Sequence, residues 1–452
     1  MCDLIQKYNV PGPRYTSYPT VPYWDLDNFS GKLWKASVVK AFQEDPKTGI
    51  SLYIHLPFCE SMCTFCGCHK RITKRHELEL PYIKTIIKEW QLYCALLDTK
   101  PTIKEIHLGG GTPTFFSPKH LRILMEGILQ HGKKAETYQF SFEGHPNNTT
   151  KAHLQTLFDL GFRRVCFGVQ DYNETVQKAI NRIQPFENVK NVTEWARQIG
   201  YTSIGHDIIY GLPFQTLENV EETILKTIEL KPERIAFYSY AHVPWLKGSG
   251  QRGYRDEDIP SGTEKRVQYE IGKKILTDSG YVDIGMDHFS LPSDDLYEAM
   301  INGNLHRNFM GYTPSKTKLM IGLGASSISD SWYGFAQNVK GVEEYENLVS
   351  NGVLPIFRGH ILTEEDQILR KHILNLMCQF ETGWGLGEAR ITDFQKIFDK
   401  LSELEFDGLV AIETDCIKIT QKGRPFVRNV SMAFDLKLHR KKPDTRLFSM
   451  TV

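Results

Sequence analysis

The chain has 452 residues, of which 41% are hydrophobic, so it can bury the core of a large domain and of a smaller one. Lysine plus arginine and aspartate plus glutamate number 54 each, and this balance gives no general electrostatic attraction to nucleic acid or to an anionic membrane. The N-terminus lacks a signal-peptide pattern and no run of about 18 apolar residues occurs, so we expect a cytoplasmic protein that does not bind membranes.

Residues 1–35 are expected to form an extended arm. The segment PGPRYTSYPT at residues 11–20 is rich in proline and tyrosine, and no helical periodicity runs through the region. Proline fixes the backbone and removes amide donors, which is typical of chain that lies over another element. We therefore predict an N-terminal arm at 1–35, followed by a barrel domain with an extension at 36–355 and a smaller domain at 356–452.

From about residue 50, short β-rich apolar runs alternate with amphipathic helical segments. The predicted strands are Ser51–Leu56, Ile103–Leu108, Gln139–Phe142, Arg164–Val169, Ser203–Tyr210 and Arg234–Tyr240. The predicted helices are Tyr82–Leu97, Pro118–Gln130, Lys151–Leu160, Val189–Ile199, Leu217–Leu230 and Glu264–Ser279. This order predicts an α/β fold with a parallel sheet and right-handed crossovers, either an open doubly wound sheet or a barrel.

Polar or glycine-rich residues come at the end of each predicted strand. They are a cysteine loop, the run Gly109–Thr114, Glu143, Gln170, Asp207 and Ala241. Polar and glycine-rich residues at the carboxyl ends of all the strands are typical of a barrel active site, so we favour a barrel over an open sheet. By default Glu143 and Asp207 are solvated or capping carboxylates at the ends of their strands, but in a site they could accept hydrogen bonds from ligand hydroxyl or amino groups.

After about residue 285 the alternation weakens, and from about residue 360 the pattern changes. Helices are predicted at Glu364–Cys378 and Ile391–Leu404, followed by a β-hairpin that turns at Glu413–Asp415. Helix, helix and hairpin resemble a winged-helix arrangement. Because no strongly basic recognition helix is present, we predict a small α+β domain that packs against or covers the site rather than one that reads DNA.

Four of the nine cysteines lie within ten residues, in the run PFCESMCTFCGC that follows the first strand. The other five are scattered, which argues against a disulfide framework. Structural zinc sites commonly use two separated CxxC pairs, whereas CxxxCxxC makes one compact loop. Three thiolates at this spacing, Cys59, Cys63 and Cys66, can hold an iron–sulfur cluster and leave one iron open, so we favour iron over zinc.

The CxxxCxxC run after a first strand, with Phe65 before its third cysteine, resembles the radical S-adenosylmethionine superfamily. The resemblance implies a partial (β/α)6 TIM-like barrel and one [4Fe-4S] cluster on Cys59, Cys63 and Cys66. It also implies that S-adenosylmethionine binds the open iron and is cleaved to a deoxyadenosyl radical. The run Gly109–Pro113 is similar to the glycine motif that contacts the methionine amino group in that superfamily.

Nearly the whole chain is more specifically similar to the oxygen-independent coproporphyrinogen III oxidase family. The carrying segments include PGPRYTSYPT at 11–20, LYIHLPFCESMCTFCGC at 52–68, HLGGGTPT at 107–114, GVQDYNETVQKAINR at 168–182, DIIYGLP at 207–213 and HRNFMGYT at 306–313. The resemblance implies oxidative decarboxylation of two propionate side chains of coproporphyrinogen III to vinyl groups, which gives protoporphyrinogen IX. It further implies two molecules of S-adenosylmethionine and an electron donor such as flavodoxin or ferredoxin, and we expect a monomer.

The family's site residues carry over position by position. Cys59, Cys63 and Cys66 match the cluster ligands, whereas Cys68 matches a cysteine that does not bind iron. Tyr53, Gly110, Glu143 and Ile328 match contacts of the cluster-bound S-adenosylmethionine, and Tyr53 joins the cysteines as a catalytic residue. Phe65, Gly111, Thr112, Gln170, Arg182, Asp207 and Ala241 match contacts of the second molecule. The arm from Arg14 to Tyr18 is expected to cover the substrate, where a guanidinium suits a polycarboxylate.

Two positions depart from the family pattern. Met310 stands where members often have glutamine, which removes an amide beside the expected second S-adenosylmethionine. Glu143 is followed by Gly-His-Pro rather than by an apolar residue, Asp and Pro, so any role of that acidic residue does not transfer. Paralogues regarded as haem-binding chaperones form the main alternative, but they typically lack the fourth cysteine, the arm and the HRNF segment. A radical enzyme with another substrate would leave the flanking segments unexplained.

Overall fold

The computed structural model describes residues 2–244, 250–251, 253–385, 387–388, 393–441 and 447–451. Twelve of the described strands form one sheet, and its centre consists of parallel strands that pair in chain order. These strands are β1 (Ile50–Leu56), β4 (Thr102–Gly110), β5 (Lys133–Gly144), β6 (Arg164–Gln170), β7 (Ser203–Tyr210) and β8 (Arg234–Ser239). Every strand predicted from the alternation is confirmed, and β5 begins six residues earlier than expected.

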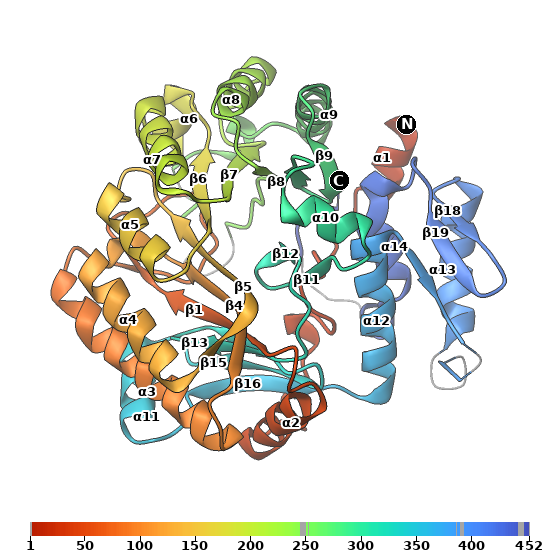
Figure 1. Cartoon of the computed structure of the whole chain (residues 1–452). Helices are drawn as coiled ribbons and strands as arrows, with labels where there is room; N and C mark the ends of the chain where they lie inside the picture. The colour runs from red at the N-terminus through yellow and green to blue at the C-terminus, as the bar shows by residue number, and fades with distance from the viewer. Residues whose placement is uncertain are drawn as a thin grey trace.

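The order β1-β4-β5-β6-β7-β8 contains no reversal, whereas a doubly wound sheet changes direction at its centre. Right-handed crossovers then bring the connecting helices to the outer face, where Figure 1 shows them in an arc around the strands. They are α3 (Glu79–Leu97), α4 (Pro118–His131), α5 (Lys151–Asp159), α6 (Glu174–Ala179), α7 (Phe186–Ile199), α8 (Leu217–Glu229) and α9 (Gly262–Asp278). Within the described residues β8 pairs with β7 and β10, not with β1, so the barrel is partial, as predicted.

Several of the barrel helices begin at a residue whose side chain caps them. The hydroxyls of Ser117, Thr150 and Thr216 accept a hydrogen bond from the third backbone amide of α4, α5 and α8 respectively. Each helix turns its apolar stripe to the sheet, and the central strands are buried almost without interruption, as expected for parallel strands covered on both faces. None of the described helices combines the length and apolar character that a membrane-spanning helix needs.

Short strands that the sequence analysis did not predict extend the sheet at both edges. Beyond β1 lie β13 (Met320–Leu323), β14 (Ile328–Asp330), β15 (Gly334–Asn338) and β16 (Ile356–Ile361); beyond β8 lie β10 (His288–Ser290) and β9 (Val282–Gly285). Two small ladders pair β2 (Phe58–Cys59) with β3 (Arg71–Ile72) and β11 (His306–Asn308) with β12 (Gly311–Thr313). The remaining helices here are α10 (Asp295–Ile301) and α11 (Val342–Ser350), with 3-10 turns η2 (His76–Leu78), η3 (Pro113–Phe115) and η4 (Asp256–Asp258).

The N-terminal arm is less extended than expected. Helix α1 (Cys2–Tyr8) precedes it, η1 (Val21–Tyr23) interrupts it, and α2 (Gly31–Glu44) begins before residue 35. The expectation of an extended chain is therefore wrong at both ends of the segment and holds between α1 and η1. In that stretch Tyr15 and Tyr18 are each 1% exposed, and the Tyr15 hydroxyl donates to Asp435 near the C-terminus, so the arm is packed into the fold rather than laid on its surface.

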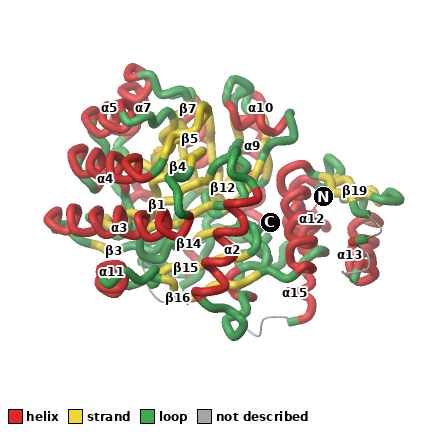
Figure 2. Tube along the Cα trace, turned by 60° about the horizontal axis from the view of Figure 1, so that its bottom comes forward, coloured by secondary structure: helices red, strands yellow, loops and turns green. Residues whose placement is uncertain are grey.

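The C-terminal region lies beside the barrel in both views (Figures 1 and 2). Its elements are α12 (Glu364–Gln379), β17 (Glu381–Gly383), α13 (Phe394–Phe406), β18 (Val410–Ile412), β19 (Cys416–Ile419), η6 (Arg424–Phe426), α14 (Val427–Ala433) and α15 (Leu436–Arg440). The predicted helix, helix and hairpin are confirmed, although Ile391, the first residue of the second predicted helix, lies outside the described residues. Strand β17 was missed, and it completes a three-stranded sheet in the order β17-β19-β18.

A buried carboxyl group joins α3 to the edge strands. The side chain of Glu89 is fully buried and accepts hydrogen bonds from the Gly324 amide at 2.8 Å, the Asn338 amide group at 2.7 Å and the Tyr345 hydroxyl at 2.7 Å. These donors come from the turn after β13, from β15 and from α11. Burial raises the pKa of Glu89 to about 7.

This raised pKa predicts a stability that depends on pH. The folded chain keeps a proton on Glu89 that the unfolded chain releases above pH 4.5, so the free energy of unfolding should fall by about 3 kcal/mol from this group as pH rises to about 7. We expect Glu89→Gln to flatten this slope, measured by urea unfolding across that pH range. The exposed Glu298→Gln variant is the control, and an equally steep slope in Glu89→Gln would contradict the interpretation.

Candidate active site

The cysteine loop leaves β2 at Cys59 and returns to the fold at β3. Its middle is tied to the segment after β6: the Thr64 amide donates to the Ile180 carbonyl at 3.0 Å, and the Asn181 side chain donates to the Met62 carbonyl at 2.7 Å. Lys70 donates to the Cys66 carbonyl at 3.1 Å. The middle of the loop is therefore fixed to the neighbouring segment, and its second half is closed by a contact within the loop.

The thiols of the loop have different surroundings. The Thr112 hydroxyl donates to Cys59 Sγ at 3.3 Å, and the Arg182 guanidinium donates to Cys63 Sγ at 3.7 Å. Burial raises the pKa of Cys59 to about 11, whereas the hydrogen bond from Cys68, followed by the charge of Lys70, lowers the pKa of Cys66. Cys68 is the exposed member of the four.

A cavity of about 540 Å³ opens between the loop and the carboxyl ends of β4, β5, β6 and β7. It brings together most of the residues that the family resemblance indicated. Those that line it are Cys59, Cys63, Phe65, Cys66, Gly110, Gly111, Thr112, Glu143, Gln170, Arg182 and Asp207. Residues from five separate parts of the chain thus meet in one space, as expected for the carboxyl face of a barrel.

Two glycines allow β4 to end close to its neighbours. Gly110 has a φ of +116°, a conformation that favours glycine. A Cβ on Gly111 would lie 2.5 Å from the Pro57 carbonyl oxygen and 3.0 Å from Cys59 Sγ. Any side chain at residue 111 would therefore displace the start of the cysteine loop.

The two predicted carboxylates differ in position and environment. Glu143 lies at the end of β5, where Oε1 is 3.3 Å from His107 Nε2 and Oε2 accepts from the Gly110 amide at 3.4 Å. Asp207 lies within β7, three residues before its end, so the expectation that it ends its strand is wrong. The Cys166 thiol donates to Asp207 at 3.2 Å, and burial raises the pKa of Asp207 to about 7.

Three predicted residues do not line the cavity. Tyr53 on β1 bonds to His55 at 3.0 Å and stacks on His107, which is itself in contact with Glu143. Ile328 on β14 packs against a cluster that contains Trp24. Ala241 follows β8 and is exposed, and its carbonyl accepts a hydrogen bond from Gln251 at 3.0 Å.

The structure adds residues that the sequence analysis did not select. Cys166 and Tyr238 line the cavity from β6 and β8, at positions that strand alternation could have indicated. Gln251 is 3% exposed and bonds to the carbonyls of Phe65 and Ala241, but no pattern in the sequence marks it. Of the two departures from the family pattern, His145 lines this cavity and Met310 lines a smaller one that also contacts Glu143 and Asp207.

The donors and acceptors of the cavity fit an iron–sulfur cluster beside a polar organic cofactor. Gln170 Oε1 and Arg182 Nε are buried without a hydrogen-bond partner, so the cavity wall presents an acceptor and a donor that a ligand could satisfy. Within the described residues no three His, Cys, Asp or Glu side chains are gathered for a single metal ion. A cubane differs from a single ion because each thiolate binds a separate corner.

Comparison with known proteins agrees with this arrangement. The family model described as the Radical SAM superfamily matches residues 53–226. The oxygen-independent coproporphyrinogen III oxidase of Synechocystis sp. is 38% identical over 100% of this chain and 97% of its own, and that of Escherichia coli is 37% identical over 97% and 95%. The solved E. coli coproporphyrinogen III oxidase (HemN), described as a radical SAM enzyme, superposes with a TM-score of 0.89 at 34% identity, over 96% of this chain and 98% of that one.

The chain belongs to the oxygen-independent coproporphyrinogen III oxidase family. Membership in the radical SAM superfamily brings a [4Fe-4S] cluster and S-adenosylmethionine as cofactors. The predictions of the family, of an α/β partial barrel with a C-terminal domain, and of these two kinds of cofactor are confirmed.

The close approach at Gly111 predicts that cluster loading depends on this glycine. Gly111→Ala should lose most of its iron, because the new methyl group overlaps the Pro57 carbonyl and crowds Cys59. Gly67→Ala is the matched control, since a Cβ at Gly67, between Cys66 and Cys68, meets no atom within 4 Å. Iron and sulfide per chain after anaerobic reconstitution measure the effect, and equal loading in the two variants would contradict it.

Proposed function

We propose that this chain converts two propionate side chains of coproporphyrinogen III to vinyl groups without oxygen and so produces protoporphyrinogen IX. Each conversion breaks a C–H bond and the C–C bond to the carboxylate, forms a C=C bond and releases CO2. Each conversion also removes one hydrogen atom and one electron from the substrate. The observation that carries the proposal is the cavity in which the cysteine loop faces polar residues of the barrel. The chain that forms this cavity matches the E. coli oxidase over almost its full length.

Cys59, Cys63 and Cys66 hold the cluster in this proposal, and Cys68 does not. When bound, the cluster and S-adenosylmethionine supply a radical that takes the hydrogen atom from the substrate. Thr112 and Arg182 support the cluster by donating hydrogen bonds to the sulfurs of Cys59 and Cys63. Such donors stabilise negative charge on thiolates.

We assign Tyr53, Gly110, Glu143 and Ile328 to the cluster-bound S-adenosylmethionine. The contacts among Tyr53, His107, Gly110 and Glu143 support this set because they hold the Glu143 carboxylate at the end of β5, facing the cysteine loop. Ile328 receives the least support, since its side chain packs beside Trp24.

A second S-adenosylmethionine would use Phe65, Gly111, Thr112, Gln170, Arg182, Asp207 and Ala241. The unpartnered atoms of Gln170 and Arg182 support this site, because both are buried in the cavity wall and a polar ligand could bond to them. Gln251 links Phe65 to Ala241 and would keep these two ends of the site together. Met310 contributes no amide in the neighbouring cavity.

Burial weakens the charge of ionisable groups in the cavity wall. It raises the pKa of Asp207 to about 7, and the Cys166 thiol donates a hydrogen bond to this carboxyl group. Burial lowers the pKa of His145 to about 3, so this imidazole lines the cavity as an uncharged side chain at neutral pH. An electron donor such as flavodoxin or ferredoxin, a monomeric state and a cytoplasmic location stay predictions from the sequence.

Anaerobic turnover tests the proposed function. Reconstituted protein with a reductant, S-adenosylmethionine and coproporphyrinogen III should form vinyl product, measured by chromatography of the oxidised porphyrins. We expect Cys66→Ser to abolish the product and to lose iron, and Cys68→Ser to keep the iron of the wild type. Stoichiometric haem binding without any vinyl product would instead identify a haem-binding chaperone.

Counting bound S-adenosylmethionine tests the second site. Equilibrium dialysis of the reconstituted protein should give two molecules per chain, and Gln170→Ala should reduce this to one, because it removes the buried acceptor on the β6 side. The iron content should not change, since in the described residues no hydrogen bond joins Gln170 to Cys59, Cys63 or Cys66. A wild-type stoichiometry of one would disprove the second site.

A further inference from the structure

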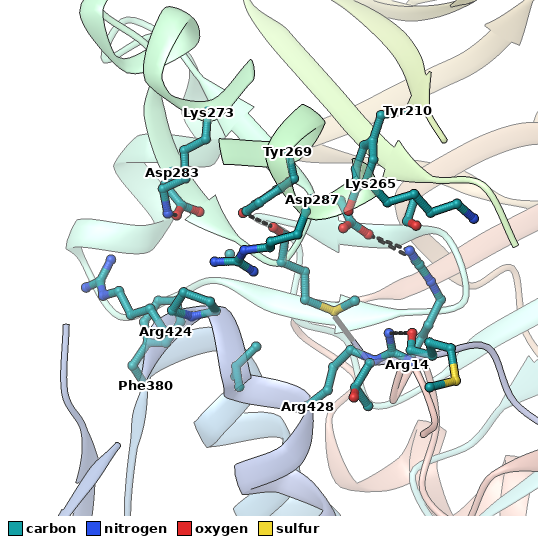
Figure 3. Close-up of a pocket in the computed structure, with 18 residues that line it drawn as sticks. Arg14, Tyr210, Lys265, Tyr269, Lys273, Asp283, Asp287, Phe380, Arg424 and Arg428 are labelled. Carbon is teal, nitrogen blue, oxygen red and sulfur yellow. Dashed lines mark hydrogen bonds and ion pairs between the residues drawn. The ribbon is translucent and has the colours of Figure 1, made fainter. Parts of the chain in front are cut away.

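A second cavity lies between the barrel and the C-terminal region (Figure 3). Its walls come from the arm, from α9, from the turn between β9 and β10, and from η6 and α14. Its volume of about 50 Å³ exceeds the roughly 10–15 Å³ that a cavity needs to hold one water. The space therefore suits one small group rather than a whole tetrapyrrole.

Cationic side chains dominate this cavity. Its basic lining residues are Arg14, Lys265, Arg266, Lys273, Arg424 and Arg428, and its acidic ones are Asp283 and Asp287. Asp287 pairs with Arg14 at 2.7 Å and Asp283 pairs with Lys273 at 2.5 Å. Both carboxylates are thus already engaged, and the lining keeps an excess of positive charge.

Two of the arginines have no ion pair within the described part of the chain. Arg428 is 6% exposed and donates to carbonyl oxygens of the arm and of the C-terminal segment, among them Pro13 at 3.0 Å and Met450 at 2.8 Å. Arg424 lies over the Phe380 ring at 4.3 Å. Burial, followed by repulsion from Arg14, lowers the pKa of Arg428 to about 9.

Arg266 supplies the most specific sign of a missing ligand. Its side chain is buried, with 8% exposure, and one end of the guanidinium contacts Glu270. Its Nε, however, is buried without a hydrogen-bond partner in a cavity wall. Native structures rarely leave such a charged donor unsatisfied, so an acceptor is expected there.

Strand β8 contributes one residue to the wall of this cationic cavity and one to the first cavity beside the cysteine loop, here called the cluster cavity. Tyr238 lines the cluster cavity, and its neighbour Ser239 lines the cationic one. The Arg14 guanidinium lies 5.9 Å from the centre of the Tyr238 ring. Arg14 therefore connects the wall of the cationic cavity to a residue that lines the cluster cavity.

We propose that the cationic cavity binds a carboxylate of the substrate that does not react. This inference rests on the proposed function: two of the four propionates persist in the product, and their carboxylates need a fixed cationic partner. Arg266 and Arg424 act as binding residues, and Arg14, already paired with Asp287, lies between the two cavities. The arm covers the substrate from the side of this second cavity.

Steady-state kinetics of the reconstituted enzyme tests the proposal. Arg266→Gln and Arg424→Gln should each raise KM for coproporphyrinogen III about tenfold or more and change kcat by less than about twofold, because they weaken binding and not chemistry. Arg266→Lys should recover part of the affinity. Lys274→Met is the matched control, since Lys274 is on the same helix but pairs with Asp278 at the surface, and its KM should equal that of the wild type.

The outcomes separate this inference from the proposed function. Vinyl formation by the wild type, together with an unchanged KM in both arginine variants of normal iron content and thermal stability, would overturn the inference and leave the function intact. If the wild type forms no vinyl product, fluorescence binding of coproporphyrin III still tests the cavity: an affinity lower in Arg266→Gln than in Lys274→Met supports it, and equal affinities overturn it. Inorganic phosphate that binds the wild type as tightly as coproporphyrin III would mark a site for free anions and would also overturn it.

Discussion

The contact on which the rest of the site depends is the pairing of the β4 end with the start of the cysteine loop. The Gly111 amide donates to the Leu56 carbonyl at 2.9 Å, and the Thr112 amide donates to the Phe58 carbonyl at 3.0 Å. This pairing requires two backbones to approach without a side chain between them, which glycine at residue 111 permits. The middle of the loop is fixed to Ile180 and Asn181, and the three thiols face the cavity. These backbone contacts therefore position the residues that we assign to the cluster.

The parts of the fold that the sequence could predict are those whose signal is local. Each central strand is an apolar run followed by a helical segment, the helices after β4, β5 and β7 begin at a capping hydroxyl, and the chain order of the strands follows from short right-handed crossovers. The cysteine spacing was equally local. Asp207 was misplaced because a carboxylate on a barrel strand need not end the strand: alternation directs it into the interior, where a buried partner such as Cys166 can satisfy it.

The parts that could not be predicted depend on contacts between distant segments. Strands β13 to β16 have three to six residues each, and their pairing is fixed by partners such as Glu89 on α3, which lies far away in the sequence. Gln251 is a surface-type residue that becomes 3% exposed once the segments around Phe65 and Ala241 meet. The arm shows the same effect, because Arg428, some four hundred residues later, holds the carbonyls of Gly12 and Pro13. Neither end of that contact carries a pattern that indicates the other.

The two cavities divide recognition from chemistry in a way that suits a large anionic substrate. The cluster cavity contains thiols, glycine backbone and carboxylates, and its cationic lining residues are Arg182, which donates to Gly168 and Cys63, and Lys70, which donates to the Cys66 carbonyl. Strong cationic partners placed there would hold a reacting carboxylate and oppose its departure as neutral CO2. The excess of arginine and lysine lies instead in the cationic cavity, against the arm and the C-terminal region. The arm contributes to the surroundings of both cavities. Arg14 forms an ion pair with Asp287 in the cationic cavity and lies over the ring of Tyr238, which lines the cluster cavity. Because one residue makes both contacts, the arm joins the two sites.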